Sequence, residues 1–292
     1  MNASLPDNHP SIDYYDSDYP SRDGSEYPEN FDAITEIQGL AHDVDRFLEI
    51  AEKVGGPVLE LCCGTGRVAL ALARKGHEVV GVDVSEAMLE RFRNRLEREE
   101  PDVIARITLV RQDVTRLDLP AKDYPLAIAP FNSLLCVTDF EGQLECLRRA
   151  AQHLREGGTL VVDAVNPHSL PVQGDPVPKP FFTRRNVRTG RWYTRFAAIG
   201  PMEPDQRQKL FGWYDELEEN GRVRRTPYSL HWRPIHRYEL ELMLRIAGFT
   251  VEAVQGGHRG EPFTLACSKL FVIAKKRSDG ASRLVATREE EG

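Results

Sequence analysis

Two glycines follow a short apolar run in the segment Leu61-Cys62-Cys63-Gly64-Thr65-Gly66-Arg67. Glycine at such a point allows a tight turn and lets a ligand approach the main chain closely. A helix that starts after the turn offers free N–H groups to that ligand. The pattern therefore predicts a binding loop, although alone it also fits the dinucleotide fingerprint G-x-G-x-x-A, with Ala69 as its last residue.

Three acidic residues lie in or just after predicted strands around this loop. Glu60 lies inside the first strand, Asp83 ends the second, and Asp113 follows the third. A carboxylate at the position of Asp83 can accept hydrogen bonds from both hydroxyls of a ribose. A carboxylate at the position of Asp113 can accept one from an adenine amino group. The three acids together predict a site for an adenosine-containing cofactor.

The elements that must position these residues alternate between strand and helix, which predicts an α/β fold with a Rossmann-like, doubly wound sheet. The sheet is expected to be mostly parallel with an antiparallel last strand. The expected strands are residues 58–61, 78–82, 107–110, 126–129, 159–165, 250–254 and 269–274. The expected helices are residues 40–54, 67–75, 85–99, 143–154 and 234–246.

The alternation stops after the fifth strand. Residues 191–199, 209–218 and 223–232 are rich in aromatic residues and arginine, and Asn220-Gly221 is a strong hairpin signal. We therefore predict a small antiparallel β insert here. The expected organisation is an acidic, tyrosine-rich arm or lid (1–33), a cofactor-binding core (34–172), the β cap (173–233), the end of the core (234–276) and a charged tail (277–292).

Charge is distributed unevenly along the chain. Residues 1–33 carry a net charge of −7, whereas residues 178–237 carry +7. Two solvated surfaces would explain this difference. Our hypothesis is that the arm around Tyr14 and Tyr15 folds over the cofactor as a lid and is steadied by the basic cap. A competing interpretation assigns the basic cap to an anionic substrate.

The segments ELCCGTGRVALALARKGHEVVGVDVSEAML, LVRQDV, LREGGTLVVDAVNP and RYELELMLRIAGF resemble class I methyltransferases that use S-adenosylmethionine (SAM). The overall layout is similar to that of amino-sugar N,N-dimethyltransferases. The resemblance implies that SAM is the cofactor and S-adenosylhomocysteine (SAH) the product. The cofactor-binding residues that it implies are Glu60, Cys62, Gly64, Thr65, Gly66, Asp83, Val84, Met88, Asp113, Val114, Pro130 and Asn132.

Three other functions compete with this interpretation. An NAD-dependent oxidoreductase would leave Asp113 without a role, and the chain has no Tyr-x-x-x-Lys motif. A SAM-binding regulatory protein on the same fold stays open, because methyl transfer needs few catalytic side chains. A nucleic-acid methyltransferase is disfavoured by the overall negative charge and by Ala129-Pro130-Phe131-Asn132, which does not match the D/N/S-P-P-Y/F motif of amino-group DNA enzymes.

We therefore expect methyl transfer to a small molecule, most readily to an amine nitrogen, with O, S or C as other options and an anionic acceptor as one possibility. His168, His231 and Tyr15 are candidate catalytic residues, and Tyr14, Trp192, Trp213 and Arg233 are candidate substrate contacts. We expect no metal and no nucleic-acid or membrane partner. Five cysteines without a C-x-x-C pair, no long apolar run and no signal-peptide pattern predict a cytoplasmic monomer or homodimer.

Overall fold

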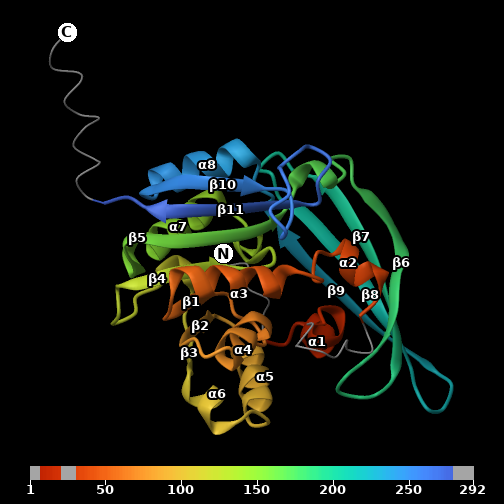
Figure 1. Cartoon of the computed structure of the whole chain (residues 1–292). Helices are drawn as coiled ribbons and strands as arrows, with labels where there is room; N and C mark the ends of the chain where they lie inside the picture. The colour runs from red at the N-terminus through yellow and green to blue at the C-terminus, as the bar shows by residue number, and fades with distance from the viewer. Residues whose placement is uncertain (1–6, 21–30, 279–292) are drawn as a thin grey trace.

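Two β-sheets organise the chain, a seven-stranded sheet in the core and a four-stranded sheet beside it (Figure 1). The computed structural model describes residues 7–20 and 31–278. The strand order of the core sheet is β10-β11-β5-β4-β1-β2-β3. Its strands are β1 (Val58–Leu61), β2 (Val79–Asp83), β3 (Ile107–Arg111), β4 (Tyr124–Ala129), β5 (Leu154–Val165), β10 (Phe249–Gln255) and β11 (Lys269–Lys276). Strands β1 to β5 pair in parallel, and β11 runs antiparallel to β5, as predicted.

Helices cover both faces of the core sheet, because its strands are apolar on both sides. Helices α3, α4 and α5 pack on one face through Phe47, Leu70 and Phe92. Helices α7 and α8 pack on the other face through Leu147 and Met243. These helices are α3 (Asp43–Val54), α4 (Arg67–Arg74), α5 (Glu86–Leu96), α7 (Phe140–His153) and α8 (Arg237–Ile246). The predicted Rossmann-like α/β fold is confirmed.

The four-stranded sheet is antiparallel, with the order β6-β7-β8-β9, and we call it the cap. Its strands are β6 (Asp175–Arg185), β7 (Trp192–Met202), β8 (Gln208–Leu217) and β9 (Val223–Trp232). Successive residues of a strand point to opposite faces, so one face of the cap turns toward the core and the other away from it. The β insert predicted after the fifth strand is therefore present.

Outside the arm and its link to α3, the sequence prediction missed strand β6 and helix α6. Strand β6 was not predicted, because it contains Pro176, Pro178 and Pro180; it lies at an edge of the cap, where proline is tolerated. A short helix, α6 (Pro101–Ala105), starts at Pro101, just after the predicted helix over residues 85–99. Proline suits the first helical position, because its missing N–H would be unpaired there anyway.

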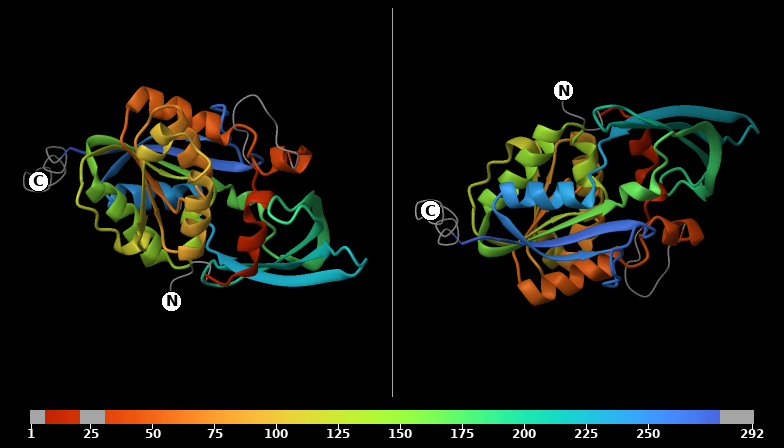
Figure 2. Two further views of the ribbon diagram at one scale, coloured as in Figure 1. Left: turned by 90° about the horizontal axis from the view of Figure 1, so that it is seen from below. Right: turned by 90° about the horizontal axis from the view of Figure 1, so that it is seen from above.

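The N-terminal arm lies between the two sheets (Figures 1 and 2). It forms the 3-10 helix η1 (Pro10–Tyr14) and the one-turn helix α1 (Tyr15–Asp18), and α2 (Ala33–Ile37) then leads into α3. Residues 1–6 and 21–30 of the predicted arm, and most of the predicted charged tail, lie outside the described residues. Within residues 7–20 and 31–278, no helix combines the length and apolar character needed to cross a membrane.

Candidate active site

The glycine loop joins β1 to α4 and uses left-handed backbone at three points. Cys62, Gly64 and Gly66 have φ angles of 57°, 55° and 82°. At Gly66 an added Cβ would lie 2.2 Å from the Phe92 ring, so only glycine fits this close approach. The N–H of Gly64 donates to the Asp83 carboxylate over 2.8 Å, which ties the loop to the end of β2. The ends of the first and second strands thus bring the glycine loop and Asp83 together.

The two acids nearest the loop are buried. Asp83 accepts hydrogen bonds from the N–H groups of Gly64 and Ser85, while burial raises its pKa. Glu60 is almost completely buried, and its Oε2 has no hydrogen-bond partner among the described residues. Burial raises the pKa of Glu60 to about 8, although the nearby Arg67 opposes that shift. An unpartnered buried carboxyl oxygen favours a cationic or hydrogen-bonding ligand at this point.

A small cavity of about 60 Å³ opens beside the loop at the ends of β1, β2 and β3. Four of the residues expected to bind the cofactor line it: Cys62, Val84, Asp113 and Val114. Burial raises the pKa of the Cys62 thiol, so this side chain is a neutral wall. The structure therefore brings Asp83 and Asp113 to adjoining parts of the sheet edge.

The turn after β4 is also left-handed, with φ angles of 44° at Phe131 and 63° at Asn132. Such angles are costly for residues other than glycine, so surrounding contacts must hold them. The N–H of Phe131 donates to the side chain of Asp163, and the N–H of Asn132 donates to its carbonyl. The side chain of Asn132 in turn accepts the N–H of Val165. β5 thus fixes the turn that presents the Phe131 ring.

A larger cavity of about 690 Å³ lies between this turn and the inner face of the cap. Its walls are mainly apolar, with a few polar groups, which is typical of small-molecule sites. The core contributes Phe131, Asn132 and Val165, and the arm contributes Tyr19. The cap contributes Phe181, Arg195, Ala197, Ile199, Leu210, Tyr228, Leu230 and Trp232. We call this space the cap cavity.

The arm closes over the glycine loop. A Cβ at Gly64 would lie 3.6 Å from the hydroxyl of Tyr15, so this tyrosine rests on the loop itself. Thr65 donates its hydroxyl proton to Asp16 over 2.6 Å. The Tyr15 ring meets the Tyr19 ring edge-on at 4.9 Å. Desolvation raises the pKa of Tyr15, so its hydroxyl stays protonated and serves as a hydrogen-bonding group.

The same arm is anchored in the cap through Asp18, whose side chain is 1% exposed. Its carboxylate accepts hydrogen bonds from the hydroxyls of Tyr193 and Tyr214, at 2.7 and 2.8 Å, and pairs with Arg195 at 3.0 Å. Tyr14 stacks on Tyr214 with a centroid separation of 3.9 Å. The arm and the cap therefore share one buried cluster.

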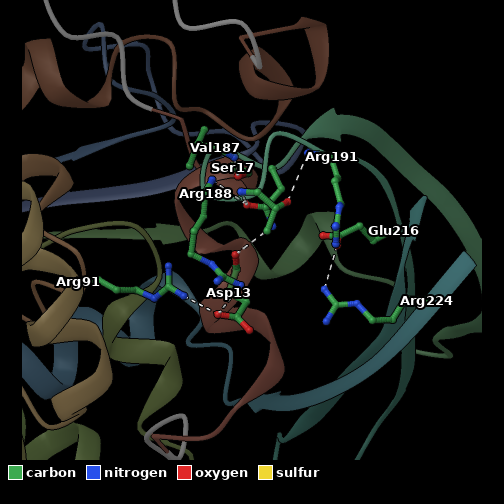
Figure 3. A network of polar contacts seen from close by, with 10 residues as sticks. Asp13, Ser17, Arg91, Val187, Arg188, Arg191, Glu216 and Arg224 are labelled. Atoms are coloured by element: carbon green, nitrogen blue, oxygen red, sulfur yellow. Dashed lines mark hydrogen bonds and ion pairs between the residues drawn. The ribbon is translucent and has the colours of Figure 1, made fainter. Parts of the chain in front are cut away.

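A more exposed set of ion pairs links the arm to both neighbours (Figure 3). Asp13 of the arm lies 2.6 Å from Arg91 of α5 and 3.4 Å from Arg188 in the turn between β6 and β7. Ser17 accepts the N–H of Val187 from that turn. An acidic residue of the arm is thus paired directly with a basic residue of the cap.

Several candidate residues lie away from the cap cavity. His168 is exposed and contacts the ring of His236, while His231 pairs with Lys209 on the outer face of the cap. The inner face of β9 instead carries Tyr228, Leu230 and Trp232. Alternate residues of a strand point to opposite faces, so His231 lies on the face opposite to Tyr228, Leu230 and Trp232. The sequence alone does not show which of these two faces turns inward.

Trp192 and Trp213 also lie on the outer face of the cap, where Trp213 stacks on Phe196. Arg233 is buried, and its guanidinium binds Gln143 and Glu239 rather than either cavity. Its position joins the end of the cap to α7 and α8. These three expected substrate contacts therefore do not line the cap cavity. Tyr14, the fourth, is part of the buried aromatic cluster.

Sequence reasoning missed most residues that line the cap cavity, among them Tyr19 and Lys269. Lys269 pairs with Val165, the last residue of β5. The sequence did contain a signal for Lys269, because the first residue of an antiparallel last strand must lie at the carboxyl edge of the parallel strands.

Of the remaining expected cofactor residues, Met88 and Pro130 are buried close to this edge. Among the described residues, no three His, Cys, Asp or Glu side chains form a metal-binding group.

Comparison with known proteins agrees with this geometry. Residues 58–158 match the methyltransferase domain family. The cypemycin N-terminal methyltransferase of Streptomyces sp is 25% identical over 76% of this chain and 84% of its own. The CcbJ methyltransferase of Streptomyces caelestis has a similar structure (TM-score 0.73, 25% identity), covering 95% of this chain and 100% of its own. SAM-bound CalS10, an amino pentose methyltransferase of Micromonospora echinaspora, shares the fold (TM-score 0.64, 18% identity, 86% and 98% covered).

The fold and the glycine-loop site thus define a Rossmann-like transferase that uses an adenosine cofactor. The chain is an S-adenosylmethionine-dependent methyltransferase.

Proposed function

We propose that this enzyme transfers the methyl group of SAM to an amine nitrogen of a small molecule held in the cap cavity. The observation that carries the proposal is the position of this cavity, between the Phe131 turn at the carboxyl edge of the sheet and the inner face of the cap. Ligands of open α/β sheets bind at this edge. The name of the cypemycin N-terminal methyltransferase supports nitrogen as the acceptor atom.

The residues around the glycine loop fit SAM. Glu60 offers an unpartnered buried oxygen, and the left-handed Gly64 lets a ligand approach the main chain. Each Asp83 oxygen accepts one backbone N–H and keeps a further lone pair for a ribose hydroxyl. We assign the methionine part of SAM to Glu60, Gly64 and Gly66, the ribose to Asp83, and the adenine to Asp113. The remaining expected contacts are Cys62, Thr65, Val84, Met88, Val114, Pro130 and Asn132.

SAM supplies the methyl group and a thioether leaving group when bound. The chain must then align the acceptor and keep water out, and such positioning can contribute about 7–11 kcal/mol. The Phe131 turn, Tyr19 and the inner face of the cap orient the acceptor in our proposal, while the arm excludes water. A neutral amine carries its own lone pair, so no general base is required.

We propose further that the acceptor need not be anionic. Each cation that lines the cap cavity already has a carboxylate partner in the structure. Arg195 pairs with Asp18, Lys269 with Asp163, and Lys179 with Asp175. Carboxylates therefore balance the positive charge of the cations that line the cavity.

The substitution Asp83→Asn should weaken SAM binding by about 10- to 100-fold, because a charged acceptor of hydrogen bonds is replaced by a neutral amide. Isothermal titration calorimetry with SAM and SAH measures the change. The matched control is Asp118→Asn, since Asp118 is exposed and pairs with Lys122. Equal SAM affinity in wild type and Asp83→Asn would refute the ribose assignment.

The raised pKa of Glu60 makes SAM binding depend on pH. Below about pH 8 the free enzyme holds a proton on Glu60, which must leave before the carboxylate can face the positive charge of SAM. Affinity should therefore rise as pH increases toward about 8 and level off above it. Calorimetry in buffers of different ionisation enthalpy should detect the released proton, and Glu60→Gln should abolish this release. A wild-type enzyme that binds SAM without proton release at pH 7 would contradict the assignment.

A further inference from the structure

Lys269 combines burial with unused hydrogen-bonding capacity. Its side chain is 5% exposed, yet it lines the cap cavity, and its Nζ lies 4.9 Å from the centre of the Phe131 ring. Among the described residues, its Nζ donates to Oδ2 of Asp163 over 3.4 Å and lies 3.2 Å from Oδ1 of the same carboxylate. An ammonium group has three N–H donors, so Lys269 keeps donor capacity for a ligand while its charge is already balanced.

Gln38 presents the complementary group in the same cavity. Its side-chain oxygen is buried and has no hydrogen-bond partner among residues 7–20 and 31–278. The next residue, Gly39, is left-handed, and a Cβ there would lie 2.5 Å from Cε of Lys269. This glycine therefore lets the linker between α2 and α3 lie directly against the lysine. A buried oxygen acceptor and a buried donor consequently come from touching segments.

We propose that Gln38 and Lys269 form a subsite that recognises a hydroxyl group of the methyl acceptor. This inference rests on the function proposed above. A hydroxyl accepts one hydrogen bond and donates another, so it satisfies both side chains at once. A carboxylate would accept from Lys269 but could not donate to Gln38, and Asp163 already neutralises the lysine.

The location of the subsite sets the substrate class. Lys269 faces the ring of Phe131, and Phe131 belongs to the turn at the sheet edge where the transferred methyl is expected. The recognised hydroxyl therefore lies close to the methylated nitrogen. We therefore expect the acceptor to be an amino alcohol whose hydroxyl lies near the methylated amine.

The test uses the full-length protein saturated with SAH and three small probes of similar shape. Calorimetry compares trans-2-aminocyclohexanol, cyclohexylamine and trans-2-aminocyclohexanecarboxylate. The amino alcohol should bind at least about tenfold more tightly than cyclohexylamine, because loss of a hydroxyl leaves two buried polar groups unpaired. In Gln38→Met this preference should fall below about threefold.

The control variant is Glu36→Met, since Glu36 is an exposed residue of α2, two positions before Gln38, and lies outside the cavity. It should keep the full preference for the amino alcohol. Gln38→Met leaves the Lys269–Asp163 pair intact, so the fold is preserved, and unchanged SAH binding verifies this. Equal affinities for the first two probes, tighter binding of the carboxylate, absence of binding by all three, or an unchanged preference in Gln38→Met would each overturn the subsite. Failure of wild type to bind SAH would instead contradict the proposed function.

Discussion

Replacing Asp18 by alanine is expected to lower the free energy of unfolding by about 3–5 kcal/mol, which is the usual cost of removing one partner of a buried ion pair. The substitution leaves the guanidinium of Arg195 without its carboxylate in a buried position. It also removes the acceptor of the hydroxyls of Tyr193 and Tyr214. Three buried donors would thus lose the same partner.

Urea denaturation followed by circular dichroism measures this change. Asp13→Ala provides a matched control in the same arm, because the Asp13 side chain is 54% exposed and its pair with Arg91 is screened by solvent. That variant should lose only about 0–1 kcal/mol. A similar, small loss in both variants would show that Asp18 does not join the arm to the cap as described.

Deleting residues 1–20 should have the largest effect on catalysis. The deletion removes Tyr15 from the glycine loop and Tyr19 from the wall of the cap cavity. Misplacing an acceptor by about 1 Å can cost 100-fold in rate, and we expect turnover to fall at least about that much. SAM affinity should also decrease, because the lid that excludes water is lost. Formation of SAH measures turnover, and calorimetry measures affinity.

Because the deletion also removes stabilising contacts, hydrogen exchange in the intact protein provides an independent test. Amides around Tyr14 and Tyr15 should be protected, and SAH should increase their protection if the arm closes over the cofactor. Higher salt should reduce this protection in part, since it screens the exposed pair of Asp13 and, more weakly, the half-buried pair of Asp16 with Arg95. Equal, unprotected exchange with and without SAH would rule out a lid.

The core was predictable from sequence because local and global signals agree there. The parallel α/β pattern accounts for three features: the apolar run of β1, the two glycines of the loop and the acid that ends β2. The left-handed angles at Gly64 and Gly66 are those for which glycine is suited. The turn at Phe131 and Asn132 gave no such signal, because tertiary hydrogen bonds from β5 hold its strained backbone.

The cap was predictable as a sheet but not in its orientation. Aromatic residues occur on both faces, so their presence alone could not separate Tyr214, which is buried against the arm, from Trp213, which packs on the outer face. The sequence also did not show which residue pairs with the buried Asp18. Asp18 and Arg195 are far apart in sequence, and only the opposite net charges of their segments pointed to contact.

The central claim is that the cap cavity receives the acceptor beside the sulfur of the cofactor. A crystal structure of the full-length enzyme with SAH tests it most directly. We predict that the ribose hydroxyls contact Asp83 and that the sulfur faces the cap cavity next to Phe131 and Tyr19. A structure in which the sulfur points away from this cavity, or in which SAH binds elsewhere on the chain, would contradict the account.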